Sequence, residues 1–129
     1  MIRSPRLLAA LLIANVIASA AHVADNALRF AHYPEPAWIT GPGVVELLWF
    51  AITPLLALAW WLATRDHKWA ALATLALYSV PSLFTLGHYF YASPLDLPFA
   101  INALIALEAT SAALLLAVAP LAIGRRSAR

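Results

Sequence analysis

Residues 7–30 read LLAALLIANVIASAAHVADNALRF, an apolar run that ends in a polar stripe. The run exceeds the ~20 helical residues that cross the ~30 Å hydrocarbon core of a bilayer. Its last third carries four polar residues, His22, Asp25, Asn26 and Arg29. Their i, i+3, i+4 and i+7 spacing places them on one face of a helix. Because ionisable groups inside a membrane are costly, we expect this face to meet partners or a cavity and not lipid.

The composition extends this interpretation to the whole chain. Of the 129 residues, 64% are hydrophobic and 11% are charged, whereas a soluble domain carries about 25% charged residues. We therefore predict one all-α polytopic membrane domain over residues 1–129. The basic residues do not gather on a soluble face, so nucleic acid is not an expected partner. The absence of cysteine excludes disulfides, a thiolate nucleophile and a cysteine-based metal site.

Four apolar segments, about 7–30, 43–63, 69–91 and 98–123, predict a four-transmembrane-helix bundle. The basic residues flank these segments on one side, with Arg29 alone on the other; the first set comprises Arg3, Arg6, Arg65, Lys68, Arg125, Arg126 and Arg129. This asymmetry predicts that both termini are cytoplasmic in a multi-pass protein of the cell (inner) membrane. A signal peptide cleaved near Ala18-Ser19-Ala20 is the competing interpretation, but the helical pattern continues through Arg29.

Polar and aromatic side chains from all four predicted spans fall in the same outer leaflet, where we expect an apolar pocket. Pro54 and Pro81 would bend two spans and help to open it, although proline is also ordinary in membrane helices. The candidate ligand-binding residues are Asp25, Asn26, Glu46, Trp49, Tyr78, His88, Asn102 and Glu108.

Several of these residues also have simpler structural interpretations. Asp25 could pair with Arg29 at a solvated helix end, and His88 could belong to an interfacial aromatic belt. Glu46 could lie among the headgroups, and His22 could be a hydrogen-bonded core histidine. Glu108 is harder to explain in this way, because an unpaired charge near mid-membrane costs at least ~2.5–3.5 kcal/mol.

Acid–base chemistry on a hydrophobic substrate is one use for such a set, with Asp25, Glu46 and His22 as candidate catalytic residues. Burial raises a carboxyl pKa, and two neighbouring carboxylates can share a proton. Histidines and carboxylates could also suit zinc or iron, but the Glu-x-x-His signature of di-iron bundles is absent, so no metal ligand is assigned. Proton-coupled transport by one four-helix unit would require an oligomer.

An ordered set of motifs resembles the EXPERA family, which includes the emopamil-binding sterol isomerase and the sigma-two receptor. These motifs are Asp25, Tyr33-Pro34, Pro36-Ala37-Trp38, Glu46-Leu47-Leu48-Trp49-Phe50, Pro54, Lys68-Trp69 and Tyr78-Ser79-Val80. The resemblance covers most of the first three spans. It implies that Asp25 and Glu46 correspond to an acidic pair at a buried pocket for sterols and cationic amphiphiles.

We therefore expect a membrane protein that binds a sterol-like, isoprenoid or other amphiphilic lipid, with double-bond isomerisation and enzymatic turnover left open. The alternatives are a non-catalytic accessory or chaperone-like membrane protein and a metal-dependent membrane enzyme. No cofactor is assigned, and a homodimer is left open.

Overall fold

The computed structural model describes residues 4–124 as an all-helical bundle. Its elements are α1 (Pro5–Leu28), η1 (Phe30–His32), α2 (Pro42–Ile52), α3 (Pro54–Thr64), α4 (Lys68–Leu83), η2 (Phe84–Phe90) and α5 (Phe99–Ile123). They form four candidate membrane spans, Pro5–Leu28, Pro42–Thr64, Lys68–Phe90 and Phe99–Ile123. The predicted multi-pass four-helix architecture is confirmed, and each span begins and ends within two residues of its predicted bounds.

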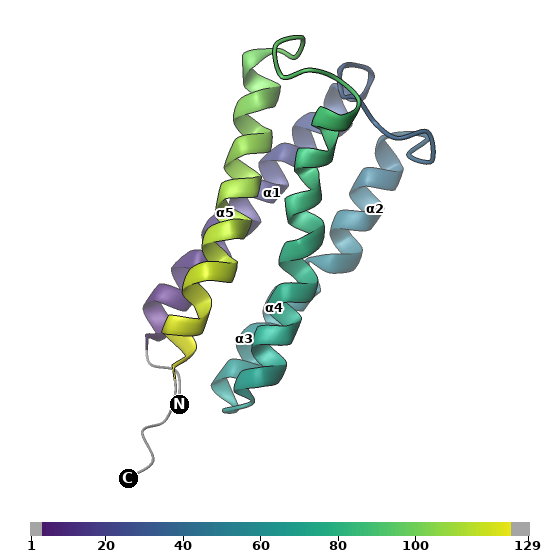
Figure 1. The fold of residues 1–129 in the computed structure, drawn as a ribbon. Helices are drawn as coiled ribbons and strands as arrows, with labels where there is room; N and C mark the ends of the chain where they lie inside the picture. Colours follow the sequence, from purple (N-terminus) through teal and green to yellow (C-terminus); the bar gives the residue numbers. More distant parts are fainter. Residues whose placement is uncertain (1–3, 125–129) are drawn as a thin grey trace.

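The spans run up and down, so the bundle has two distinct ends (Figure 1). We call the end with the two longer connections, residues 29–41 and 91–98, the loop end. The opposite end, with residue 4, the short turn at 65–67 and residue 124, is the terminal end. The cytoplasmic location of the termini stays a prediction, and four of its basic residues, Arg3, Arg125, Arg126 and Arg129, lie outside the described residues.

Proline begins or interrupts most of these helices. Pro5, Pro42 and Pro54 lie in first turns, where a missing backbone N–H costs least. Pro54 also divides the second span, because α2 ends at Ile52 and α3 starts after Thr53. Pro81 lies near the end of α4, and the third span then continues as the tighter helix η2. The predicted bends therefore occur as a break in one span and a change of helix type in the other.

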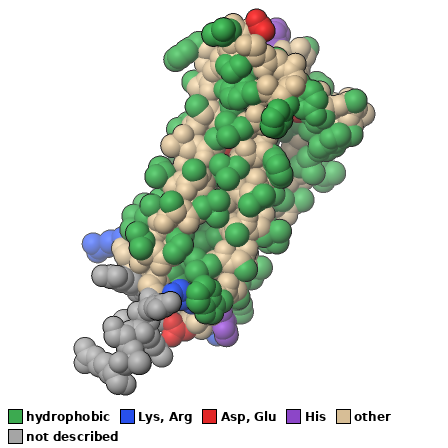
Figure 2. Space-filling model, viewed as in Figure 1, with side chains coloured by type: hydrophobic (Ala, Val, Ile, Leu, Met, Phe, Trp, Pro, Cys, Tyr) green, Lys and Arg blue, Asp and Glu red, His purple; other side chains and the backbone are tan. Residues whose placement is uncertain are grey.

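The terminal half of the bundle is a dry apolar core. Its largest buried side chains include Leu8, Leu56, Leu75 and Leu115. Small residues complete it, which lets helix backbones approach closely in a membrane; the buried alanines of this cluster are Ala59, Ala63, Ala71, Ala119 and Ala122. Hydrophobic side chains also cover the outside along its length, and charged side chains gather mainly at the two ends (Figure 2). Since the terminal half of the interior and the outer surface are mostly apolar, most of the buried polar side chains lie in the loop half of the interior.

Candidate functional site

Two stripes of polar side chains cross the interior of the loop half. On α1 the stripe is Asn15, Ser19, His22 and Asn26, and on α4 and η2 it is Ser79, Ser82, Thr85 and His88. All eight residues are buried. The spacing of three and four residues keeps the first stripe on one face of α1. In the second stripe, Ser79 and Ser82 share a face of α4 at a spacing of three, and the same spacing aligns Thr85 and His88 on η2, because a 3₁₀ helix has 3.0 residues per turn.

Glu108 of α5 joins the two stripes at the centre of the site. Its Oε2 atom lies 2.5 Å from Nδ1 of His22, and Ser82 donates a hydrogen bond of 2.7 Å to Oε1. Thr85 Oγ1 lies 3.1 Å from the same His22 nitrogen. Glu108 and His22 are only 6% and 4% exposed. Both oxygens of a deeply buried carboxyl group are thus held by side chains from two other helices.

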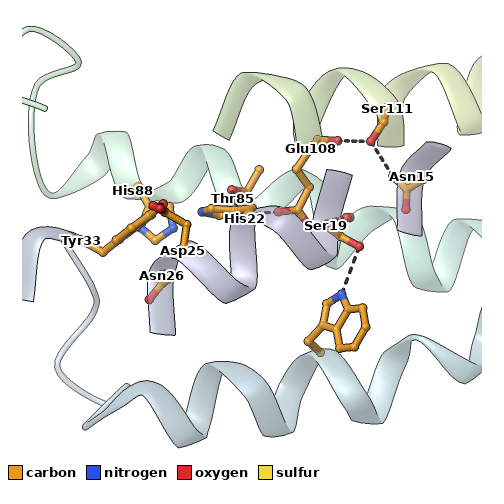
Figure 3. A network of polar contacts seen from close by, with 12 residues as sticks. Asn15, Ser19, His22, Asp25, Asn26, Tyr33, Thr85, His88, Glu108 and Ser111 are labelled. Carbon is orange, nitrogen blue, oxygen red and sulfur yellow. Dashed lines mark hydrogen bonds and ion pairs between the residues drawn. The ribbon is translucent and has the colours of Figure 1, made fainter. Parts of the chain in front are cut away.

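The second ring nitrogen of His22 has no partner. Nε2 is buried and forms no hydrogen bond with any part of the chain that the structure describes. The imidazole lies between Glu108 on one side and His88 and Tyr33 on the other (Figure 3). Its ring centroid is 5.5 Å from that of Tyr33 and 5.4 Å from that of His88. A buried nitrogen without a partner is costly, so this atom marks the site as incomplete.

The segment Tyr33-Pro34-Glu35 closes the loop end above His22. Asn26 donates a hydrogen bond of 2.5 Å to Oε1 of Glu35, and Nδ1 of His88 donates to the Pro34 carbonyl at 3.1 Å. The carboxylate of Glu35 also lies 3.8 Å from Nδ1 of His88, and its side chain is only 8% exposed. We call this segment the cap.

Tyr33 anchors the cap to the end of α1. Its hydroxyl donates a hydrogen bond of 2.7 Å to Asp25, which also forms an ion pair with Arg29 one turn later. Burial, together with the hydrogen bond to the Asp25 carboxylate, raises the pKa of Tyr33 far above its usual value. The phenol therefore stays neutral and keeps its donor role.

On the terminal side of Glu108 the polar contacts involve neutral groups. Asn15 donates a hydrogen bond of 2.8 Å to Ser111, which donates at 2.8 Å to the Glu108 backbone carbonyl. Ser19 lies 3.4 Å from the Tyr78 hydroxyl. The indole N–H of Trp49 donates to Ser19 at 3.0 Å. This last bond ties α2, which buries none of its own residues, to α1.

An apolar groove of about 310 Å³ lies between α1 and α3, beyond the Trp49–Ser19 contact. Its lining residues are Leu12, Ile13, Val16, Ile17, Leu56, Ala57 and Trp60. This groove lies on the terminal side of Pro54 and none of the predicted site residues lines it, so the outer pocket lined by acidic residues stays a prediction. The residues of the second span that line the groove all come after Pro54, so the groove lies between the break and the terminal end of the bundle.

The expected meeting of Asp25 and Glu46 is corrected by the structure. Asp25 turns to Arg29 and Tyr33, partners supplied by its own helix end and the cap. Glu46 is exposed near the start of α2, and no hydrogen bond or ion pair joins it to Asp25 within residues 4–124. A carboxylate one turn from a helix end can reach headgroups and water, so it needs no buried partner.

The remaining predicted residues divide between the site and its surroundings. His22 and Glu108 form the central pair, His88 and Asn26 hold the cap, and Tyr78 and Trp49 contact Ser19. Asn102 instead accepts from Tyr89 and donates to the carbonyls of Pro94 and Leu97, which fixes the start of α5.

Sequence reasoning missed Ser82, Thr85 and Glu35 as site residues. The polar repeat at 79, 82, 85 and 88 was an available signal for the first two. Glu35 lies in a proline-rich loop where no periodicity indicates which side chains turn inward.

The fold and this cluster define a class: a four-span membrane protein with a buried carboxyl–imidazole pair near the loop end. Within residues 4–124, no three His, Asp or Glu side chains are grouped so that they could hold a metal ion. Comparison with family models, curated proteins and solved structures finds no match for this chain.

Proposed function

We propose that this protein binds a sterol-like, isoprenoid or other amphiphilic lipid at the His22–Glu108 pair. The observation that carries the proposal is the free Nε2 atom of buried His22, beside an engaged carboxyl group. A polar network that serves only to join helices is expected to satisfy its own donors and acceptors. An imidazole nitrogen left open at membrane depth instead favours a ligand with a hydroxyl or amine group. The resemblance to the EXPERA family, which implies the same ligands, is part of this proposal.

The apolar part of the ligand would occupy the groove between α1 and α3. Val16 at the groove, Ser19 and His22 follow one another at three-residue intervals on α1. At a rise of ~1.5 Å per residue, His22 lies ~9 Å along the axis from Val16, a distance that a lipid readily spans. Trp49 separates the two sites through its bond to Ser19. Because α2 buries none of its residues, this indole can move aside with little loss of packing.

The chemistry that the pair can supply is proton transfer. A protonated His22 can donate the Nε2 proton to one carbon of an alkene, leaving a cation at the neighbouring carbon. Loss of a proton from the next carbon back to Nε2 then forms the shifted double bond, with no oxidant or reductant. Glu108 would stabilise the imidazolium before the first proton transfer and after the second.

Lipid retention tests the binding proposal. Purified protein is extracted for mass spectrometry and, separately, labelled with a photoreactive sterol and a photoreactive fatty acid. Glu108→Gln and His22→Phe should lose the retained lipid, and Ala57→Trp should block labelling by filling the groove. Ala106→Trp is the matched control, because Ala106 is exposed on α5 and does not line the groove. Equal labelling of all four variants would overturn the proposal and favour the accessory role.

Turnover has its own test. Reconstituted protein is incubated in D₂O with a panel of unsaturated sterols and isoprenoids. Isomerisation through Nε2 should add deuterium to carbon, and His22→Phe should abolish the mass shift while the wild-type fold is retained. Binding without deuterium uptake would leave a lipid-binding protein and remove the isomerase step.

A further inference from the structure

We infer that Glu108 exchanges its proton with water at the loop end alone, through His22, His88 and Glu35. The inference concerns the path of the proton and stands independently of lipid binding. It starts from the two different environments of the nitrogens of His22. Nδ1 lies 2.5 Å from the Glu108 carboxyl group, whereas Nε2 is free on the side of the ring away from Glu108 (Figure 3).

An imidazole in this position is a proton relay. A proton that binds Nε2 gives an imidazolium with both nitrogens protonated. Release of the other proton from Nδ1 to the Glu108 carboxylate then regenerates neutral imidazole, with one proton in and one out. The ring returns to its starting tautomer by the reverse transfer or by rotation.

Titratable groups continue the path from Nε2 toward the loop end. The His88 ring lies edge-on to His22 with centroids 5.4 Å apart, so a small ring rotation can bring a nitrogen of each ring within hydrogen-bond distance. Glu35 lies 3.8 Å beyond, at Nδ1 of His88, with its side chain 8% exposed, and its place in the partly exposed cap makes it the last titratable member before water at the loop end. Tyr33 packs against both imidazoles but keeps its proton, since its hydroxyl is bound to Asp25. Arg29 in turn neutralises Asp25, so neither competes for the proton.

No comparable path leads from Glu108 toward the terminal end within residues 4–124. Of the buried side chains, the two histidines and the glutamate, His22, His88 and Glu108, all lie at Glu108 or toward the loop end. Of the groups that face Glu108 from α4, Ser82 is a hydroxyl donor and Tyr78 a buried phenol. Past Asn15 and Ser111 comes the leucine and alanine core of the terminal half, which offers no site for a proton. The path is therefore one-sided.

Infrared spectroscopy of protein in phospholipid vesicles tests the path. The carbonyl band of the protonated carboxyl group is assigned to Glu108 by its loss in Glu108→Gln. A rapid change of external pH should shift this band quickly only in molecules whose loop end faces outward. Cleavage of a C-terminal tag by external protease measures the opposite fraction. The amplitude of the fast phase should equal the tag-protected fraction.

Variants along the path identify its members. His88→Phe keeps a ring, and Glu35→Gln keeps an oxygen that can accept the bond from Asn26, but neither can pass a proton; each should slow the fast phase by about tenfold or more. His32→Phe, at an exposed loop-end histidine outside the path, should leave the rate unchanged. Wild-type rates in both path variants, a fast phase that follows the tag-accessible fraction, or a band that survives Glu108→Gln would each overturn the inference. If His88→Phe fails to fold, Glu35→Gln decides.

Discussion

Nδ1 of His22 and Oε2 of Glu108 lie 2.5 Å apart although 86 positions separate the two residues in the chain. This contact joins α1 to α5, the two helices that pack together along most of their length (Figure 1). Around it the second stripe supplies Ser82 and Thr85. The pair is thus both a tie between helices and the chemical centre of the molecule.

Removing either partner of the pair should destabilise the bundle. Glu108→Ala leaves His22 without a partner at Nδ1 except Thr85, and His22→Ala leaves a buried carboxyl group with Ser82 alone. We expect each change to cost about 1–3 kcal/mol, with a coupling free energy of about 1 kcal/mol or more in the double mutant. Reversible unfolding in mixed micelles measures all three variants. Strict additivity would show that the contact contributes nothing beyond its separate parts.

The cap should loosen when one of its side-chain hydrogen bonds to α1 is removed. Asn26→Ala deletes the donor to Glu35, and Glu35→Ala deletes the acceptor. Both should increase hydrogen exchange in residues 33–41, because only Tyr33 at Asp25 and His88 at the Pro34 carbonyl would then remain of the side-chain contacts described for the cap. His32→Ala serves as the control, since that side chain is exposed. Unchanged exchange in both cap variants would place the anchor elsewhere.

Tyr33 should make stability fall in strong alkali. Its pKa in the folded protein is raised, first by burial and then by the hydrogen bond to Asp25. The contribution of this neutral phenol is therefore complete below the ordinary tyrosine pKa of about 10. It is lost as the pH rises from there toward the folded pKa, because only the unfolded chain ionises. Unfolding at several alkaline pH values should show this slope, and Tyr33→Phe should remove its share of it.

The single hydrogen bond from Trp49 should have a modest effect on stability. Trp49→Phe keeps an aromatic ring against α1 but removes the donor to Ser19. Hydrogen bonds between membrane helices average about 0.6 kcal/mol and reach about 1.7, so a loss in this range is expected from micelle unfolding. Trp61→Phe is the comparison, because Trp61 is 48% exposed on α3. Equal losses in the two variants would remove any special role for the indole N–H.

Much of the architecture can be predicted from hydrophobicity, because the cost of placing each residue in a membrane depends mainly on that residue alone. Runs of about 20 apolar residues define spans, and the cost of a charge at mid-membrane singles out Glu108. Neither argument depends on how the helices pack, so both hold from sequence alone. His22 and Glu108 were both recognised as candidates in this way. Their pairing was not, because a choice of partner depends on the rotation of each helix about its axis.

The prediction that Asp25 and Glu46 meet was wrong for a reason that lies close to each residue in the sequence. Arg29 lies four residues after Asp25 on the same helix, and a partner at that spacing needs no tertiary fold. Glu46 has a second option, which is to reach the membrane surface. The groove between α1 and α3 is not predicted from the sequence, because its position depends on how α3 packs against α1 after Pro54, which no residue pattern records.

Every side chain of α2 is at least partly exposed, and this has a consequence for how the sequence can vary. Because most side chains of this helix are exposed on the outside of the bundle, packing against neighbouring helices constrains them little. At these positions one apolar residue should be as stable as another. Trp49 and Ile52 are exceptions, since the indole reaches Ser19 and Ile52 packs against the apolar core. Saturation mutagenesis of residues 42–52 should therefore find a permissive stretch interrupted at Trp49 and Ile52.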